Sequence, residues 1–277
     1  MRIVPFLAAL SLLGSAHARV TVPPFQHVVV IVFENKDTAQ VLGNRAAPTF
    51  NTIARRYATL TRYYGVAHPS LPNYLALVSG STHGIRTDCT DCVVSGPSLA
   101  DTLERAGRTW KLYAEGLPSP GFTGPFAGAY AKKHNPFVYF HDVLSSPARL
   151  ARVVALPQLR ADLRARAVPD LAVVVPNLCH SMHDCSVSVG DRWLRSTLPP
   201  LLGLPDTVVF VLFDEGTSSV RGGGHVPAIA AGTAVRRGAR FSGLTSHYGV
   251  LRTIETAWQL PLLGRSASAK PITGVWR

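Results

Sequence analysis

Uninterrupted apolar runs alternate with amphipathic segments along this chain. The first clear run, HVVVIVF at residues 27–33, is rich in β-branched side chains, which is typical of a strand buried on both faces. Three further segments of this kind are predicted to join the same sheet, and they span 109–114, 170–176 and 207–213.

Helical patterns lie between these runs. They combine apolar residues spaced three and four apart, a serine suited to an N-cap and an Arg/Leu-rich stretch. The predicted helices span 48–60, 98–106, 148–167 and 246–260. Because buried strands alternate with helices, we expect an α/β fold with a mostly parallel central sheet and helices on both faces. The Gly- and Pro-rich stretch 116–128 is predicted to be a loop, so residues 19–277 are expected to form a single domain.

The N-terminus has the features of a secretory signal peptide over residues 1–18. Met1 and Arg2 precede an apolar run at 3–13, and an A-x-A cleavage pattern ends at Ala18. That run is too short to cross a bilayer, and no later stretch approaches the ~20 uninterrupted apolar residues of a membrane helix. We therefore expect an exported protein without a transmembrane segment, either periplasmic or secreted.

Export changes the interpretation of the four cysteines. In an oxidising compartment, two local pairs favour two structural disulfides, Cys89–Cys92 and Cys179–Cys185. A four-cysteine metal site is the alternative, although the second pair lacks the usual C-x2-C spacing. A redox-active pair at Cys89 and Cys92 is a further alternative, but no thioredoxin-like context accompanies it.

Composition excludes few classes of binding partner. Of 277 residues, 47% are hydrophobic, which excludes a disordered chain. The net charge is +12, and 23 of the 28 basic residues are Arg, so the surface favours anionic partners. No compact Lys/Arg-aromatic motif indicates specific nucleic-acid binding. The sequence does not define an oligomeric state.

Polar residues follow the predicted strands, where parallel sheets bind their ligands. Glu34 and Asn35 follow the first strand, and Asp214 and Glu215 follow the last. Three crowded carboxylates repel one another unless a divalent cation joins them, and their oxygens suit Mg²⁺, Ca²⁺ or Mn²⁺.

Three histidines also follow the predicted strands, in the same loops as these polar residues or close to them. His180 and His183 follow the third strand, and His225 follows three glycines that would let the backbone approach a ligand closely. These imidazoles would either ligate a softer ion such as Zn²⁺ or donate hydrogen bonds to an anion. A satisfied loop residue is the plainer interpretation of each, most of all of His180.

Ser70 lies at a predicted helix start, because Pro72 suits a first helical turn. Backbone N–H groups and the positive end of the helix dipole favour a phosphate there. A serine in that place is a nucleophile if a bound metal deprotonates it, and Asn73 would donate to a phosphoryl oxygen. A simple helix cap is the alternative for Ser70.

Four motifs in this order resemble the bacterial phosphoesterase family of acid phosphatases and phospholipases C, within the alkaline phosphatase superfamily. They are HVVVIVFEN at 27–35, HPSLPNYLALVSG at 68–80, PNLCHSMHDC at 176–185 with GDRWL at 190–194, and FDE at 213–215 followed by GHVP at 224–227. SGSTHGI at 79–85 is also similar to nucleotide pyrophosphatase/phosphodiesterases, and 248–255 fits as well.

The resemblance implies a role for each matching residue. Ser70 matches the nucleophile that is transiently phosphorylated, and Asn73 matches the asparagine that holds a phosphoryl oxygen. The implied metal ligands are Glu34, Asn35, Ser70, Asp214 and Glu215. His183 and His225 resemble histidines that contact phosphate, and His180 is a weaker match. Since the acidic pair is Asp-Glu rather than Asp-His, we expect one divalent metal ion (Mg, Ca, Mn or Zn).

These observations predict an exported, metal-dependent acid phosphatase that acts on small phosphate monoesters through a phosphoserine. A phospholipase C-like phosphodiesterase is the alternative within the same chemistry. A non-catalytic periplasmic binder of phosphate-bearing ligands is the alternative from another class.

Overall fold

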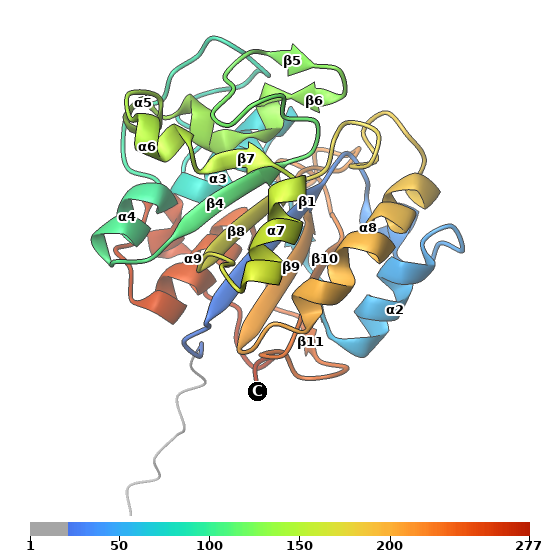
Figure 1. Ribbon diagram of the computed structural model, residues 1–277. Coiled ribbons are helices and arrows are strands. Elements are labelled where there is room, and N and C mark those ends of the chain that lie inside the picture. Colours follow the sequence, from blue (N-terminus) through green and yellow to red (C-terminus); the bar gives the residue numbers. More distant parts are fainter. Residues whose placement is uncertain (1–21) are drawn as a thin grey trace, which may run out of the picture.

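The computed structural model describes residues 22–277, and the predicted signal peptide lies outside this range. An eight-stranded sheet forms the centre of the molecule, in the order β11-β2-β10-β9-β1-β8-β4-β7 (Figure 1). Among its strands, all within the described residues, β10 alone runs opposite to the others. The strands are β1 (His27–Phe33), β2 (Ala58–Leu60), β4 (Trp110–Ala114), β7 (Val153–Ala155), β8 (Leu171–Val175), β9 (Thr207–Phe213), β10 (Ala228–Ala231) and β11 (Arg240–Phe241).

Helices cover both faces of this sheet. Figure 1 shows α2, α7 and α8 in front of it and α3 and α9 behind it. The α-helices are α1 (Thr38–Val41), α2 (Pro48–Arg56), α3 (Ser70–Ser79), α4 (Leu99–Arg105), α5 (His141–Leu144), α6 (Pro147–Leu150), α7 (Pro157–Ala165), α8 (Val187–Leu202) and α9 (His247–Trp258). The α/β fold with a mostly parallel sheet is as predicted from the sequence.

Short elements complete the structure. Two small sheets pair β3 (Tyr63–Tyr64) with β12 (Thr245–Ser246) and β5 (Phe126–Ala127) with β6 (Tyr130–Ala131). Three 3-10 helices are η1 (Lys132–His134), η2 (Pro136–Tyr139) and η3 (Gly264–Ser268).

Two predicted helices were wrong in part. The helix predicted at 48–60 ends at Arg56, because the next residues pair with β10 as strand β2. The helix predicted at 148–167 is interrupted by β7, whose Val153 and Val154 pair with β4. In both cases pairing at the sheet outweighs the local helical pattern.

The register of the two central strands brings the polar ends together. Phe33 of β1 pairs with Phe213 of β9, and the N–H of Asp214 donates to the Phe33 carbonyl at 3.0 Å. The N–H of Glu34 donates to the carbonyl of Ser181, in the loop after β8, at 2.9 Å. Three carboxyl ends of parallel strands therefore meet at one edge of the sheet, as the rule for open α/β sheets requires.

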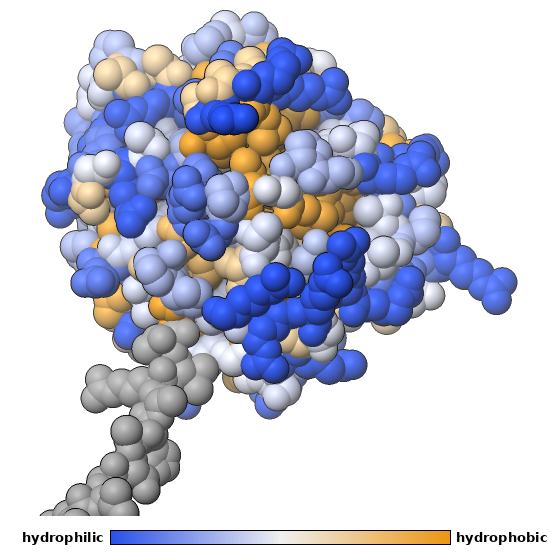
Figure 2. Space-filling model, turned by 60° about the horizontal axis from the view of Figure 1, so that its bottom comes forward, coloured by the Kyte–Doolittle hydropathy of each residue, from blue (hydrophilic) through white to orange (hydrophobic). Residues whose placement is uncertain are grey.

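The surface is polar with apolar interruptions. On the face drawn in Figure 2, strongly hydrophilic residues border an apolar area. Within residues 22–277, no helix has the length and hydropathy that crossing a bilayer requires.

Candidate active site

Three buried carboxylates form the centre of the site. Glu34 follows β1, and Asp214 and Glu215 follow β9; their exposed fractions are 0%, 1% and 4%. Asn35 lies beside them with a left-handed backbone (φ 56°), which asparagine tolerates better than most residues. Its N–H donates to Oδ1 of Asp214 at 3.2 Å.

Ser70 points into this acidic cluster. It is the first residue of α3 and is 1% exposed. Its hydroxyl lies 3.0 Å from Oε2 of Glu34 and 3.3 Å from Oε1 of Glu215. One turn later, the hydroxyl of Tyr74 donates to the other oxygen of Glu34. The structure thus brings the predicted nucleophile and the predicted acidic ligands into one contact network.

Burial and mutual repulsion disfavour the ionised forms of these three carboxyl groups. Burial raises the pKa of Glu34, and burial together with the charge of Glu34 raises the pKa of Asp214 well above its usual range. Burial and the neighbouring Asp214 raise the pKa of Glu215 to about 8. A cluster of this kind gains stability from any cation that enters it.

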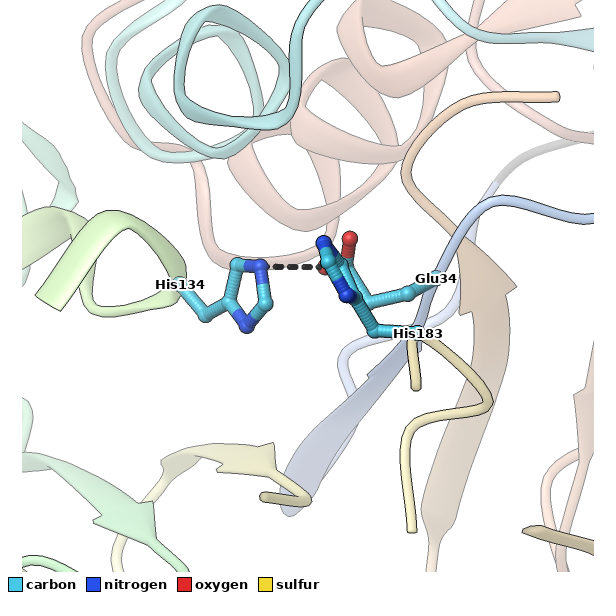
Figure 3. Close-up of side chains that lie close together, drawn as sticks. All are labelled: Glu34, His134 and His183. Atoms are coloured by element: carbon cyan, nitrogen blue, oxygen red, sulfur yellow. Dashed lines mark ion pairs between the residues drawn. The ribbon is translucent and has the colours of Figure 1, made fainter. Parts of the chain in front are cut away.

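Two histidines approach Glu34 from other elements. Figure 3 shows His134, from η1, facing the carboxylate of Glu34, with the ring of His183, from the loop after β8, close to the same carboxylate. Candidate ligand atoms of the three residues lie within 4.8 Å of one another. Nε2 of His134 lies 3.3 Å from Oε1 of Glu34, and burial lowers the pKa of this imidazole to about 4.

Lys133 completes a basic side of the site. Its Nζ lies 3.2 Å from Nε2 of His183 and 2.8 Å from Oδ2 of Asp88. Nδ1 of His183 lies 2.6 Å from Oδ1 of Asp184, so the ring can donate to Asp184 while it accepts from Lys133. Although burial acts to lower it, the bond to Asp88 raises the pKa of Lys133.

The backbone donors expected at the start of α3 are largely engaged. The N–H of Leu71 donates to Oδ1 of Asp88 at 3.0 Å, and Pro72 has no N–H. A phosphoryl group beside Ser70 therefore gains little from the backbone of Leu71 and Pro72, and Lys133, whose charge interacts with Glu34 and Asp214, is a charged donor beside the cluster.

Asn73 holds the segment that leads into Ser70. Its Oδ1 accepts from the N–H groups of Val66 at 2.8 Å and Ala67 at 3.2 Å. Its Nδ2 donates to the carbonyls of Ala67 at 2.9 Å and Pro69 at 3.1 Å. With both ends of its amide engaged by backbone, Asn73 positions Ser70 in this arrangement.

Two of the three glycines before His225, Gly222 and Gly223, pack against the same segment. A Cβ at Gly222 would lie 2.3 Å from the carbonyl oxygen of Val66. A Cβ at Gly65 would lie 2.7 Å from the carbonyl oxygens of both Asp214 and Gly223. Only glycine allows these two backbones to pack so closely.

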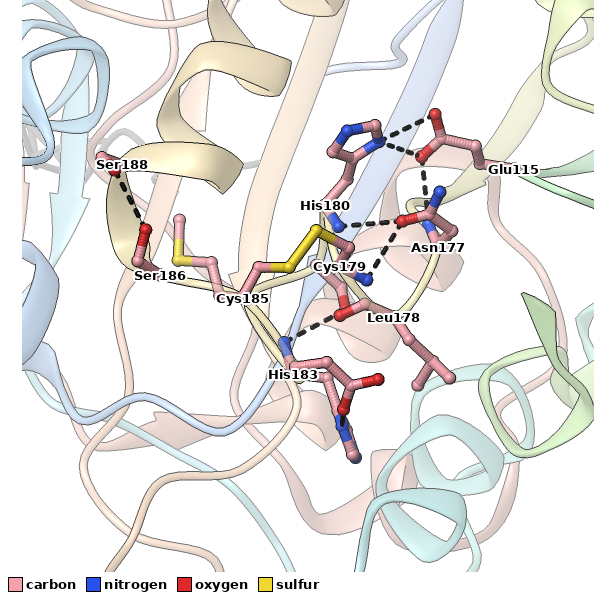
Figure 4. Close-up of a disulfide and its surroundings, with 12 residues drawn as sticks. Glu115, Asn177, Leu178, Cys179, His180, His183, Cys185, Ser186 and Ser188 are labelled. Atoms are coloured by element: carbon pink, nitrogen blue, oxygen red, sulfur yellow. Dashed lines mark hydrogen bonds and ion pairs between the residues drawn. A yellow bond between two sulfur atoms is a disulfide. The ribbon is translucent and has the colours of Figure 1, made fainter. Parts of the chain in front are cut away.

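The side chains of the remaining predicted histidines contact groups outside the acidic cluster. Nε2 of His225 lies 3.0 Å from the Thr61 carbonyl oxygen, and its ring packs against Tyr64. Nδ1 of His180 lies 2.9 Å from both carboxylate oxygens of Glu115 (Figure 4). Neither contact leads to Ser70.

Both expected disulfides are present in the structure. Cys179–Cys185 closes the loop that carries His180 and His183 (Figure 4). Cys89–Cys92 closes the loop directly after Asp88. A short covalent loop restricts the backbone on either side, so each disulfide limits the motion of a residue of the site.

The cluster fits a divalent cation. Oδ2 of Asp214 is buried and has no hydrogen-bond partner within residues 22–277, and Nε2 of His134, although 3.3 Å from Oε1 of Glu34, makes no hydrogen bond there either. Buried polar atoms without partners are rare in native proteins unless an ion or ligand meets them. The surrounding oxygens of Glu34, Ser70 and Glu215 are ligands that hard cations prefer.

Solved structures of low sequence identity share this fold. An alkaline phosphatase superfamily protein from Vibrio parahaemolyticus has a TM-score of 0.60 at 13% identity, over 90% of this chain and 71% of that one. A putative sulfatase from Bacteroides thetaiotaomicron has a TM-score of 0.59 at 12% identity, over 86% of this chain and 71% of that one. The fold is therefore alkaline phosphatase-like.

Sequence comparison then gives the family. The Phosphoesterase family model matches residues 43–261, so the chain belongs to the Phosphoesterase family and is a hydrolase of phosphoric ester bonds. A phosphatidylinositol-3-phosphatase from Mycobacterium tuberculosis is 36% identical, over 92% of this chain and 84% of its own.

Fungal acid phosphatases match as well. A probable acid phosphatase from Kluyveromyces lactis is 30% identical over 87% of this chain, and an acid phosphatase from Aspergillus fumigatus is 33% identical over 77%. The match spans 60% and 51% of the length of these two relatives.

Four residues of this site were not identified from the sequence. Lys133 and His134 follow a Gly- and Pro-rich loop whose path no local pattern predicts. His68, whose Nδ1 pairs with Oε2 of Glu215, and Tyr74 fall within the motif around Ser70. Their proximity to Ser70 in that motif is the signal that could have identified them.

Proposed function

We propose that this protein is an exported, metal-dependent acid phosphatase that hydrolyses phosphate monoesters through a phosphoserine at Ser70. The contact of the Ser70 hydroxyl with both Glu34 and Glu215 carries this proposal, because a serine needs such an arrangement to become a nucleophile. The fungal relatives, named as acid phosphatases, and the mycobacterial relative, named as a phosphatase of a phosphorylated lipid, support a monoester substrate.

The proposed cation site consists of Glu34, Asn35, Ser70, Asp214 and Glu215. A divalent ion bound there would lower the pKa of the serine hydroxyl and neutralise charge on the phosphoryl oxygens. Mg²⁺, Ca²⁺, Mn²⁺ and Zn²⁺ are the candidates, and the oxygen-rich donor set favours the harder three.

Side chains of the protein carry out the remaining steps of the reaction. Lys133 holds the phosphoryl group from the basic side while Ser70 attacks in line. The hydroxyl proton passes to a carboxylate that it contacts, Glu34 or Glu215, and the Oγ–P bond forms as the bond to the leaving alcohol breaks. Once Lys133 turns from Nε2 of His183 to the phosphoryl group, that nitrogen is free to carry the proton that the leaving oxygen takes, while Asp184 orients the ring through Nδ1. Water then cleaves the phosphoserine and restores the free hydroxyl.

Replacement of the nucleophile is the direct test. Ser70→Ala should lower kcat on p-nitrophenyl phosphate by at least about a thousandfold while the melting temperature stays near that of the parent. Ser79→Ala, at the other end of the same helix, is the matched control and should retain activity. Acid-quenched parent enzyme should carry phosphate on the peptide that contains Ser70. Near-normal activity of Ser70→Ala would refute the nucleophile.

Parallel substrates and metal analysis separate the alternatives. Bis-p-nitrophenyl phosphate and phosphatidylcholine should be hydrolysed far more slowly than the monoester; the reverse order would support a phospholipase C-like enzyme. Binding without turnover of any substrate would support the non-catalytic binder. Chelation should abolish activity, and elemental analysis should find one ion per chain, whereas two ions would point to a second site at Glu34, His134 and His183.

The proposed export rests on the signal peptide pattern and on the two disulfides, which persist in oxidising compartments. Expression of the full chain followed by fractionation tests it. The protein recovered outside the cytoplasm should begin after Ala18 by N-terminal mass analysis, and an uncleaved cytoplasmic chain would contradict this part of the proposal.

A further inference from the structure

A second concave region lies beside the segment that leads into Ser70. It is a cavity of about 630 Å³, within the size range of small-molecule sites. Residues 64–66, Arg221 and residues from 241–249 and 265–270 line it. Neither Ser70 nor any of the proposed metal ligands lines it.

The charges of this cavity have one sign. Arg221, Arg265 and Lys270 line it, and none of its lining residues is acidic. Within residues 22–277, none of these three cations lies within ion-pair distance of a carboxylate. Three unpaired cations around one hollow create a local positive potential that attracts an anion.

Aromatic rings hold two of these cations in place. The guanidinium carbon of Arg221 lies 5.4 Å from the ring centroid of Tyr64, and that of Arg265 lies 5.9 Å from the ring of Tyr248. Contact with a ring restrains an arginine without neutralising its charge, so the guanidinium can still attract a phosphate.

The rest of the lining is suited to a carbon skeleton. Val66, Phe241 and Leu244 contribute apolar surface, and Leu244 is 47% exposed. Thr245 also lines the cavity, and its buried hydroxyl has no hydrogen-bond partner among residues 22–277. The cavity therefore offers cationic and apolar contacts together.

We propose that this cavity is a second ligand site, separate from the active site, that binds an organic phosphate: an anionic phosphate group carried on an apolar or ring-shaped body. The guanidinium groups take the phosphate, and the apolar wall takes the body. The headgroup of an anionic phospholipid and a soluble phosphate ester both have this chemistry, and the experiment separates them.

Calorimetry with the non-hydrolysable probe phenylphosphonate tests the site. In the Ser70→Ala protein, which removes turnover, the probe should bind at the active site and at the cavity. The triple variant Arg221→Gln/Arg265→Gln/Lys270→Gln in that background should lose the cavity site, with an affinity loss of about tenfold or more.

The control removes the same charge elsewhere. Arg45→Gln/Arg192→Gln/Arg195→Gln changes three exposed arginines that do not line the cavity. This control should keep both binding events. Retention of the cavity site by the triple variant would overturn the proposal, because the three cations would then not hold the probe. An equal loss in the control would overturn it as well, because net charge alone would then explain the affinity.

Vesicles identify the source of the phosphate. Flotation with phosphatidylcholine vesicles, with and without phosphatidylglycerol, uses a lipid that is not a monoester substrate. Binding to the anionic vesicles that is lost only in the triple variant assigns the cavity to a lipid headgroup. Loss of phenylphosphonate binding without any vesicle binding assigns it to a soluble phosphate ester.

Activity shows whether the two sites are separate. With Ser70 intact, the triple variant should hydrolyse p-nitrophenyl phosphate within about twofold of the parent, since none of its three residues contacts the acidic cluster. A large loss of kcat on this small substrate would refute a separate site. Because binding is measured without turnover, failure of the proposed catalytic mechanism would not alter this result.

Discussion

Nζ of Lys133 lies 2.8 Å from Oδ2 of Asp88, and the other oxygen of Asp88 accepts the N–H of Leu71, directly after Ser70. The carboxylate of Asp88 therefore links the basic side of the site to the start of α3. It also occupies the helix N-terminus, which an incoming phosphate would otherwise use. Lys133 and Asp88 should affect catalysis in opposite directions through charge.

Lys133→Met should lower kcat/KM for p-nitrophenyl phosphate by on the order of a hundredfold, because the substrate loses its charged donor on the basic side. Steady-state kinetics at fixed ionic strength measure this. Lys111→Met is the matched control, since Lys111 also pairs with a carboxylate, Asp162, at 2.6 Å but lies elsewhere. Equal losses in both variants would show that the effect is structural.

Asp88→Asn should strengthen the binding of inorganic phosphate. Asparagine can still accept the N–H of Leu71, while the negative charge that competes for Lys133 is removed. We expect the inhibition constant of phosphate to fall about three- to tenfold, and Asp142→Asn, an exposed charge removal, to leave it unchanged. Weaker inhibition in Asp88→Asn would mean that the ion pair is needed to place Lys133.

Removal of the Cys179–Cys185 disulfide should affect both stability and catalysis. For the short loop that it closes, Cys179→Ser/Cys185→Ser should lower the free energy of unfolding by about 2 kcal/mol, measured by urea denaturation. We also expect kcat to fall at temperatures where the variant remains folded, because the loop fixes His183. Full activity in the folded variant would show that the loop holds its shape without the covalent link.

Glu255 should make stability depend on pH. Burial raises the pKa of this α9 carboxyl from 4.5 to about 7, and one of its oxygens is buried without a partner in the described part of the chain. The unfolded chain releases this proton first as the pH rises. The contribution of the Glu255 carboxyl to the free energy of unfolding therefore decreases between about pH 4.5 and pH 7 and stays low above that window.

Glu255→Gln removes the titration and keeps an acceptor for the N–H of Leu263. Relative to the parent, this variant should gain up to about 3 kcal/mol of unfolding free energy between pH 5 and pH 8, by the free energy of the pKa shift. Urea denaturation at both pH values measures it. Asp142→Asn serves as the exposed control. If Glu255→Gln differed from the parent by the same unfolding free energy at pH 5 and at pH 8, the explanation by a buried acid would be contradicted.

The central strands were predictable because their apolar runs have no competing pattern. The sequence analysis places β1 and β9 at their observed bounds, and hence Glu34 and Asp214 at one edge of the sheet. The short strands β7 and β2 were missed, since each follows a helical pattern and becomes a strand only through its neighbours. Helix α8 was not predicted, and it contains Pro199 and Pro200, residues that disfavour a helix interior.

The basic side of the site was beyond sequence reasoning for a different reason. Lys133 and His134 reach Glu34 across about a hundred positions of sequence, by a loop whose course depends on tertiary packing. Likewise, the role of Asn73 depends on the path of residues 66–69, which its own side chain stabilises. In each case the residue type indicated a polar role, but the sequence did not show which group the side chain contacts.

The pairing of Phe33 with Phe213 has a consequence for refolding. Both strands are apolar at nearly every position, so hydrophobic alternation cannot distinguish correct alignment from a shift by one residue. A shift would turn one of the two acidic side chains to the opposite layer. Secondary structure could then recover completely in a misaligned protein, and regained hydrolysis, rather than circular dichroism, would report the fraction of molecules that aligned correctly.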